Sequence, residues 1–379
     1  MALMTVLGLM SGTSMDGVDA AVVVTDGDAI VGYGPRLFRP YTPAEREVLR
    51  TAVREARPLT DRSERPGAVA AAERIVNEVH GETVERLLRE NHYSAGRGMP
   101  TGSSSRQTID LIGFHGQTVL HAPDRRLTVQ VGDGHALAAR VGIPVVFDFR
   151  AADVAAGGEG APLVPIYHRA LAQKAGLAGT VVVVNIGGVA NITRIAADGS
   201  LIAGDTGPGN ALIDDLVRDR TGAPMDEGGA LGARGRADQA ALSRLLDNPW
   251  FAKPLPKSLD RDAFSSLPVA PLSTPDAVAT LTAFTARTIA DAIAMAGGAE
   301  RVVVVGGGAN NPTLIRRLAA DTGVRPTSAA ALGWSPDFIE AEAFAFLAAR
   351  SVRGLPLTFP STTGVDMPVA GGVLAEPSP

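Results

Sequence analysis

Apolar runs and helical patterns alternate along the first part of the chain and predict an α/β lobe. One helix is predicted to begin after Thr42, a good N-cap that is followed by Pro43 in the first turn. Residues 94–107, rich in Gly, Ser, Arg and Pro, are predicted to form an exposed loop. The predicted strands cover residues 5–7, 20–25, 29–38, 109–114 and 144–149, and the predicted helices cover 43–55, 66–91 and 134–141.

The second part of the chain repeats this order of elements. In both parts a glycine tip joins the first two strands, and an Asp-Gly turn precedes the third. The repeat predicts duplicated lobes with a cleft between them, which is a common place for a ligand. We expect one lobe at residues 1–143 with about 350–379, and the other at 144–349. The predicted strands of the second part cover residues 180–185, 189–195, 200–203, 301–305 and 326–331, and its helices cover 211–220, 280–296, 313–321 and 338–353.

Two hairpin tips are candidates for phosphate binding. The stretch Gly8–Asp19, GLMSGTSMDGVD, offers small polar residues and backbone N–H groups without side-chain cover. An ordinary hairpin turn would have the same composition, and the stretch is not the GxxxxGK[ST] loop. A second glycine tip, Ile186–Gly188, lies at the corresponding point of the repeat. Two matching tips are better explained by one phosphate ligand than by two unrelated turns.

Glycines at Gly306–Gly308 follow four valines and precede a predicted helix. Their backbone could approach a flat ligand such as a purine closely, or could form only a tight turn from strand to helix. Asp205 begins the stretch DTGPGN, which we expect to be a loop. Its carboxylate is a candidate general base facing the cleft, and the alternative is an Asx cap of its own loop.

Imidazole and charged side chains near two other strand ends are candidates for substrate contact. His115 and His121 do not have the i,i+4 spacing of a helical zinc pair, so polar contact with a substrate is favoured over a metal site. Asp148 and Arg150 end a predicted strand, where they either face the cleft or form surface ion pairs.

Composition and charge exclude several classes of function. The chain has 35 Lys and Arg against 40 Asp and Glu, a net charge of -5, and no long basic run, so a nucleic-acid partner is not expected. It has no cysteine, which excludes disulfides and thiolate metal sites. No Lys or Arg precedes Arg36, and the valine runs are too short to span a membrane. We expect a soluble, cytoplasmic protein that binds small molecules.

Taken together, six motifs resemble those of the anhydro-N-acetylmuramic acid kinase family. They are GLMSGTSMDGVD at Gly8–Asp19, HGQT at His115–Thr118, GAPLVP at Gly160–Pro165, NIGGVANIT at Asn185–Thr193, DTGPGN at Asp205–Asn210 and GGGANNP at Gly306–Pro312. The resemblance implies two duplicated ribonuclease-H-like lobes, the actin-like ATPase fold. It also implies ATP- and Mg²⁺-dependent conversion of 1,6-anhydro-N-acetylmuramate to N-acetylmuramate 6-phosphate, with opening of the anhydro ring, in murein (peptidoglycan) recycling.

The resemblance also implies roles for individual residues. Asp205 is the expected catalytic base, and Asp16 and Asp19 are expected near the magnesium ion, which they would contact through water. The residues expected to bind ATP are Gly12, Thr13, Ser14, Met15, Asp16, Gly17, Val18, Asp19, Asn185, Gly187, Gly188, Asn191, Gly306, Gly307, Gly308 and Asn310. Those expected to bind the sugar are His115, Gln117, Thr118, Asp148, Thr206, Gly207, Pro208, Gly209 and Asn210.

Two departures and two alternatives accompany this interpretation. Glu159 stands where the family often has Gln, and residues 94–107 resemble a local insertion. A kinase of another amino sugar or hexose would share the glycine loops. So would a non-catalytic, nucleotide-gated actin-like protein, but it would have no use for DTGPGN. The oligomeric state, including a homodimer, is left open.

Overall fold

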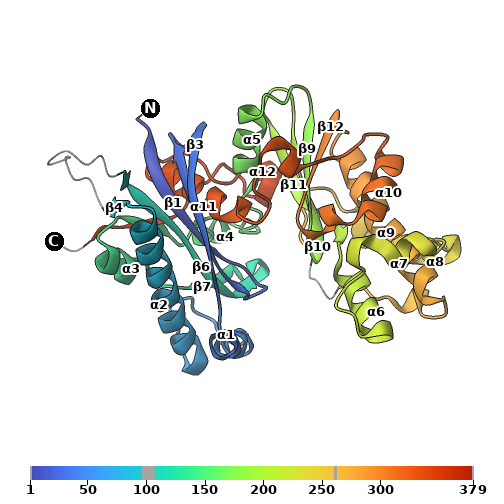
Figure 1. Ribbon diagram of the computed structural model, residues 1–379, viewed down its shortest axis with the longest axis horizontal. Coiled ribbons are helices and arrows are strands. Elements are labelled where there is room, and N and C mark those ends of the chain that lie inside the picture. The colour runs from blue at the N-terminus through green and yellow to red at the C-terminus, as the bar shows by residue number, and fades with distance from the viewer. Residues whose placement is uncertain (1, 96–106, 260–262, 378–379) are drawn as a thin grey trace. The chain divides into compact units, whose positions relative to one another are not determined.

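The computed structural model describes residues 2–95, 107–259 and 263–377 (Figure 1). The chain divides into two compact units. The first unit comprises Met1–Lys174 and Asp337–Pro379, and the second unit comprises Ala175–Pro336.

The first unit is built on a seven-stranded mixed sheet. Its strands are β1 (Met4–Ser11), β2 (Gly17–Thr25), β3 (Ile30–Pro40), β6 (Leu111–Ala122), β7 (Leu127–Val131), β8 (Val145–Phe147) and β14 (Val373–Ala375). Their order is β14-β8-β6-β1-β2-β3, with β7 paired to β6. Strands β1, β6 and β8 are parallel, whereas β2 and β3 follow β1 as antiparallel hairpin partners. A separate short pair joins β4 (Ser94–Ala95) to β5 (Thr108–Ile109).

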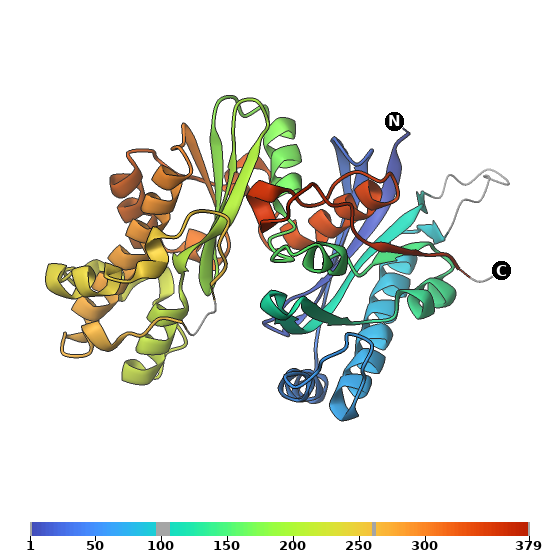
Figure 2. The same cartoon turned by 180° about the vertical axis from the view of Figure 1, so that it is seen from behind.

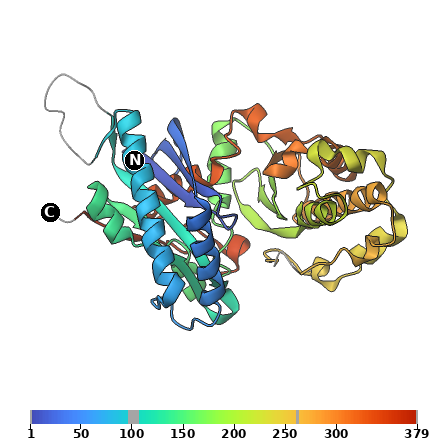
Figure 3. The same cartoon turned by 60° about the horizontal axis from the view of Figure 1, so that its bottom comes forward.

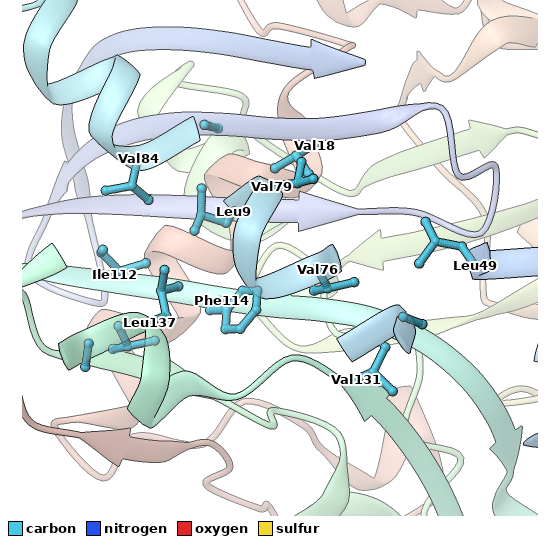
Figure 4. Packing of buried hydrophobic residues seen from close by; sticks show 14 of the residues in the cluster. Leu9, Val18, Leu49, Val76, Val79, Val84, Ile112, Phe114, Val131 and Leu137 are labelled. Carbon is cyan, nitrogen blue, oxygen red and sulfur yellow. The ribbon is translucent and has the colours of Figure 1, made fainter. Parts of the chain in front are cut away.

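Helices cover both faces of this sheet. They are α1 (Pro43–Ala56), α2 (Gly67–Glu90), α3 (Gly134–Val141), α4 (Ala151–Ala155), α5 (Pro165–Lys174), α11 (Ile339–Ser351) and α12 (Pro360–Thr363). Helices α1 and α2 lie side by side (Figure 3). Their apolar residues meet those of β1, β2, β6, β7 and α3 in one core (Figure 4).

Helix α11 lies directly on the other face of the sheet, at two glycines. Side chains alternate along β1, so Leu7 and Leu9 enter the core of Figure 4, whereas Gly8 points the opposite way. A Cβ at Gly8 would lie 1.8 Å from the carbonyl oxygen of Ala341, and one at Gly113 of β6 would lie 2.1 Å from that of Phe344. Only glycine allows the helix backbone to approach so closely.

These contacts shift the expected lobe boundaries. Residues 144–174 and 337–349 were expected in the second lobe, but they belong to the first unit. The physical reason is pairing and packing over long sequence distances. Strand β8 pairs in parallel with β6, and α11 packs on β1, β2 and β6.

The second unit repeats the strand order of the first in a five-stranded sheet, β11-β10-β9-β12-β13 (Figure 2). Its strands are β9 (Val181–Ile186), β10 (Val189–Ile195), β11 (Leu201–Pro208), β12 (Arg301–Val305) and β13 (Thr327–Ser328), and its helices are α6 (Ala211–Thr221), α7 (Ala230–Arg234), α8 (Gln239–Leu246), α9 (Thr274–Met295) and α10 (Pro312–Thr322). Here too the first three strands are antiparallel and the last two run parallel to the first. The shared order confirms the predicted duplicated α/β lobes.

Helix α9 is the core helix of the second unit. Of the helices in the described ranges, it alone has the length and composition to cross a membrane, but 78% of its apolar stretch is buried inside the protein. Its side chains pack against the sheet and against α6 and α8. Burial by these neighbours accounts for its apolar sequence.

Two strands extend beyond their predicted ends. Strand β6 continues through HGQT because Gly116 adopts φ +70° and the following residues pair with β7. Strand β11 continues to Pro208 because Asp205 and Gly207 pair with Asn191 and Ala190 of β10. HGQT, predicted at the end of a strand, therefore lies within one, and DTGP lies in a strand rather than in the loop that the sequence predicted. Residues 96–106 of the predicted loop at 94–107 lie outside the described residues.

Candidate active site

The tip of the β1–β2 hairpin is a tight turn with exposed polar side chains. The Met15 N–H donates to the Gly12 carbonyl at 3.1 Å, and Met15 has φ +53°. The Ser14 hydroxyl donates to Asp16 Oδ1 at 2.8 Å. Thr13, Ser14 and Asp16 are exposed, whereas Met15, Gly17 and Val18 are buried. Of the residues expected to bind ATP, those three buried ones can therefore contribute mainly through their backbone.

Buried side chains hold this tip in place from behind. The Ser11 hydroxyl donates to Gln117 Oε1 at 2.6 Å, and Gln117 Nε2 donates to the Gly12 carbonyl at 3.1 Å. Arg46 Nε donates to the Met15 carbonyl at 3.0 Å. Gln117, which we expected to bind the sugar, is fully buried, and both ends of its amide serve the hairpin. Sequence reasoning missed the role of Arg46.

Carboxylates of the first unit influence one another next to the hairpin. Desolvation, together with the negative charges of Asp16, Glu340 and Asp337, raises the pKa of Asp19 to about 7. Desolvation also raises the pKa of Glu340, although its side chain keeps access to solvent. Sequence reasoning missed Glu340, because an acidic residue in the first turn of an apolar helix is ordinarily explained by the helix dipole.

These carboxylates fit a magnesium ion that is bound mainly by a nucleotide. Within the described ranges, no group of three or more His, Cys, Asp or Glu could hold a metal. Mg²⁺ in nucleotide sites commonly keeps several waters and takes only one or two carboxylates besides the phosphates. Asp16 and Asp19 could supply oxygen ligands of that kind.

His115 is a neutral, buried acceptor. Its Nε2 faces Arg150 Nε at 3.2 Å and Arg150 Nη2 at 3.0 Å, so it must accept, and Nδ1–H donates to the Gly116 carbonyl at 2.8 Å. Desolvation and the Arg150 charge hold the pKa of His115 well below its usual range. Arg150 Nη1 also donates to the Gly160 carbonyl at 2.8 Å. HGQT, Arg150 and the start of GAPLVP therefore meet at one guanidinium.

Three neighbouring side chains have structural partners. Asp148, at φ +58°, forms an ion pair with Arg62, as the alternative interpretation expected. The Thr118 hydroxyl accepts from Gln130 Nε2 at 3.3 Å. Asp153, which sequence reasoning missed, is 1% exposed and accepts from the Gly160 N–H and the Thr363 hydroxyl, both at 2.6 Å. Asp153 thus holds the loop that carries Glu159.

In the second unit, three predicted stretches come together at the tip between β9 and β10. The N–H groups of Gly209 and Asn210 donate to the carbonyls of Gly188 at 2.8 Å and Gly187 at 2.7 Å. A Cβ at Gly209 would lie 2.2 Å from the Gly187 oxygen, and one at Gly306 would lie 2.5 Å from Asn185 Oδ1. Glycine is therefore required where DTGPGN and GGGANNP pack on the NIGG tip.

The remaining residues of these stretches divide between buried and exposed positions. Thr206 is 1% exposed and donates its hydroxyl to the Ala190 carbonyl at 3.1 Å. Gly207, Pro208 and Gly308 are also buried. Gly188, Gly307 and Asn310 are exposed, and Asn191 and Asn210 are partly exposed. The exposed positions are those at which a ligand has direct access.

Asp205 is partly buried on β11, and a distant segment holds it. The Leu259 N–H donates to Asp205 Oδ2 at 2.8 Å, and the Asp205 N–H donates to the Lys257 carbonyl at 2.8 Å. These contacts differ from an Asx cap within the DTGPGN stretch. Lys257 Nζ in turn donates to the carbonyls of Lys253 at 2.9 Å, Phe251 at 3.0 Å and Trp250 at 3.3 Å. The sequence analysis assigned no role to this segment.

The duplicated sheets, each with a polar glycine tip between its first two strands, define a class of α/β proteins with two ribonuclease-H-like units. The family model for anhydro-N-acetylmuramic acid kinase matches residues 4–376. The chain is 52% identical over 377 residues to the anhydro-N-acetylmuramic acid kinases of Rhodopseudomonas palustris and Bradyrhizobium diazoefficiens, covering 99% of this chain and 100% of each relative. The chain belongs to the anhydro-N-acetylmuramic acid kinase family, which confirms the resemblance found in its motifs.

Among solved structures, the chain is weakly similar to gluconate kinase from Lactobacillus acidophilus. The TM-score is 0.49 at 10% sequence identity, covering 100% of this chain and 94% of that one.

Proposed function

We propose that this protein uses ATP to phosphorylate 1,6-anhydro-N-acetylmuramate and opens its anhydro ring, giving N-acetylmuramate 6-phosphate and ADP. The observation that carries the proposal is the family match over residues 4–376, which includes all six motifs. The reaction belongs to murein recycling, and we place the enzyme in the cytoplasm, where ATP is supplied.

The substrate dictates the chemistry. A 1,6-anhydro sugar has no free O6, so water must attack C1 and break the C1–O6 bond as O6 attacks the γ-phosphorus of ATP. Asp205 takes a proton from the attacking water, O6 receives the phosphoryl group, and ADP leaves. The Leu259 N–H, at 2.8 Å from Asp205 Oδ2, supports this role because it orients the carboxylate and stabilises its charged form.

The two glycine tips are assigned to the ATP phosphates. Backbone N–H groups and hydroxyls can offset negative charge on the transferring group, and catalysis of phosphoryl transfer consists largely of such positioning and electrostatics. Asp16 and Asp19 would hold Mg²⁺ together with the phosphates, and the bound ion would neutralise part of their charge. Gly307 and Asn310, both exposed, are assigned to the adenosine.

The test is mass spectrometry of the products formed from ATP, Mg²⁺ and 1,6-anhydro-N-acetylmuramate in ¹⁸O water. We expect one labelled oxygen in the sugar, none in the phosphate group, and one ADP for each sugar. N-acetylmuramate kept in the same water for the same time measures background exchange at C1. A phosphorylated sugar whose label does not exceed this background, or no phosphorylated sugar at all, would refute the proposal.

A further inference from the structure

Arg150 is a partly buried cation whose hydrogen bonds all go to neutral groups. Two of its N–H groups converge on His115 Nε2, and Nη1 donates to the Gly160 carbonyl. His115 is 4% exposed and neutral, and its ring lies tilted against that of Phe344, with 4.6 Å between the ring centroids. These partners orient the guanidinium without cancelling its charge.

Arg150 forms no ion pair within 4.0 Å in the part of the chain that the structure describes. Both oxygens of the nearby Asp153 carboxylate are engaged by Gly160 N–H and Thr363. Glu340 and Asp153 act on Arg150 only through their charges, without a salt bridge to it. Burying a guanidinium without an ion-pair partner at contact distance is costly, and an anionic ligand bound to Arg150 would offset that cost.

Arg150 supplies a positive charge that the motif stretches themselves lack. The six motif stretches contain no Lys or Arg, and Arg150 contacts two of these stretches through His115 and Gly160. The sugar of the proposed reaction carries one carboxylate, on its lactyl group. A guanidinium fork matches a carboxylate better than any other side chain does.

We propose that Arg150 binds the lactyl carboxylate of the sugar acid and thereby selects it over neutral anhydro sugars. His115 and Gly160 act as positioning groups for the guanidinium. This inference rests on the proposed function and names the residue that determines its specificity.

The test compares two sugars in the native enzyme and in Arg150→Gln and Arg150→Lys. One is 1,6-anhydro-N-acetylmuramate, and the other is 1,6-anhydro-N-acetylglucosamine, which lacks the lactyl group. Sugar affinity is measured by calorimetry, and kcat and KM are measured for the acid and for ATP. Arg140→Gln serves as the control, because Arg140 pairs with Glu78 and Glu85 on α2, away from the motifs.

We expect Arg150→Gln to weaken binding of the acid by about 10- to 100-fold, the usual effect of losing a charge-assisted contact. Affinity for the neutral sugar and KM for ATP should stay within about threefold of the native values. Arg150→Lys, which keeps the charge but loses the fork, should lie between the native enzyme and Arg150→Gln. If the Gln variant is unstable, the comparison rests on the Lys variant, whose folding is checked by its thermal unfolding.

An equal loss of affinity for both sugars would overturn the inference. So would a rise in KM for ATP alone, which would assign Arg150 to the phosphates. Either result would leave the proposed function intact, since that depends on turnover by the native enzyme. Absence of turnover by the native enzyme would instead remove the proposed function.

Discussion

Replacing Asp205 by Asn separates a catalytic role from a structural one. The change keeps the size of the side chain, and the amide oxygen can still accept from the Leu259 N–H, now 2.8 Å from Oδ2. The negative charge and the basic lone pair are lost. The variant therefore removes the proposed chemistry and leaves most of the packing unchanged.

The structure allows both effects to be estimated. A hydrogen bond to a charged group contributes about 1.5–3 kcal/mol and a neutral one about 0.5–1.5, so the weaker Leu259 contact should lower the unfolding free energy by roughly 1–1.5 kcal/mol. For a unit of this size that corresponds to a fall in Tm of about 2–6 °C. Loss of a general base lowers kcat by about 10²- to 10⁴-fold, which raises the barrier by roughly 3–5.5 kcal/mol.

The assay measures ADP release and ring opening in parallel, with sugar affinity and Tm on the same preparation. Ring opening and ADP release should fall together, because both depend on the same proton transfer. Asp198→Asn is the matched control, since Asp198 also accepts a backbone N–H, from Ser200 at 2.9 Å, but in an exposed turn. An Asp205→Asn enzyme that is stable, binds the sugar and keeps nearly full kcat would refute the catalytic assignment. A lower Tm with unchanged kcat would support the structural role alone.

Three further predictions concern the phosphate tip, its carboxylates and the support of Asp205. A Cβ at Gly12 would meet only Ser14 Oγ, at 3.6 Å, so the Gly12→Val variant should fold normally. It should nevertheless bind ATP at least about tenfold more weakly, because the added side chain covers N–H groups that face the phosphates. An unchanged ATP affinity by calorimetry would show that the tip is not part of the phosphate site. Burial raises the pKa of Asp19 to about 7, so its stabilising contribution is complete below about pH 4 and is lost as the pH rises through about 7. Asp19→Asn should therefore flatten the fall in Tm between about pH 5 and 8. Parallel curves of Tm against pH for the native protein and the variant would contradict this. Lys257→Met should lower both Tm and kcat, because three carbonyls lose their donor in the segment that holds Asp205. A variant with a lower Tm but the kcat of the native enzyme would show that the segment does not position the base.

Local signals predicted most strands and seven of the helices, but not α4, α5, α7, α8 or α12. Helix α1 begins as expected: the Thr42 hydroxyl accepts from the Glu45 N–H at 3.2 Å, and Glu45 Oε2 accepts from the Thr42 N–H at 2.7 Å. Such caps involve residues three apart, so the sequence contains all the information they need. The repeated order of elements likewise predicted two sheets with the same topology.

Contacts between distant residues account for what the sequence analysis missed. The hydrogen bond from Gln117 to the hairpin tip joins residues more than a hundred positions apart in the chain. Leu259 reaches Asp205 across 54 positions. No spacing rule connects such pairs, because which residues meet depends on how the strands are ordered in the sheet.

The sequence by itself determined the α/β elements, their duplication, the glycine tips and membership of the kinase family, because those features are encoded by residues close together in the chain. Tertiary structure alone decided that α11 completes the first unit, that HGQT and DTGP continue strands, and that Arg150 meets His115 and Gly160. Each of these depends on sheet pairing or on a close approach of backbones, such as that of α11 to Gly8. Such contacts are favourable only once the chain has collapsed into its sheets, when burial offsets the cost of ordering distant segments.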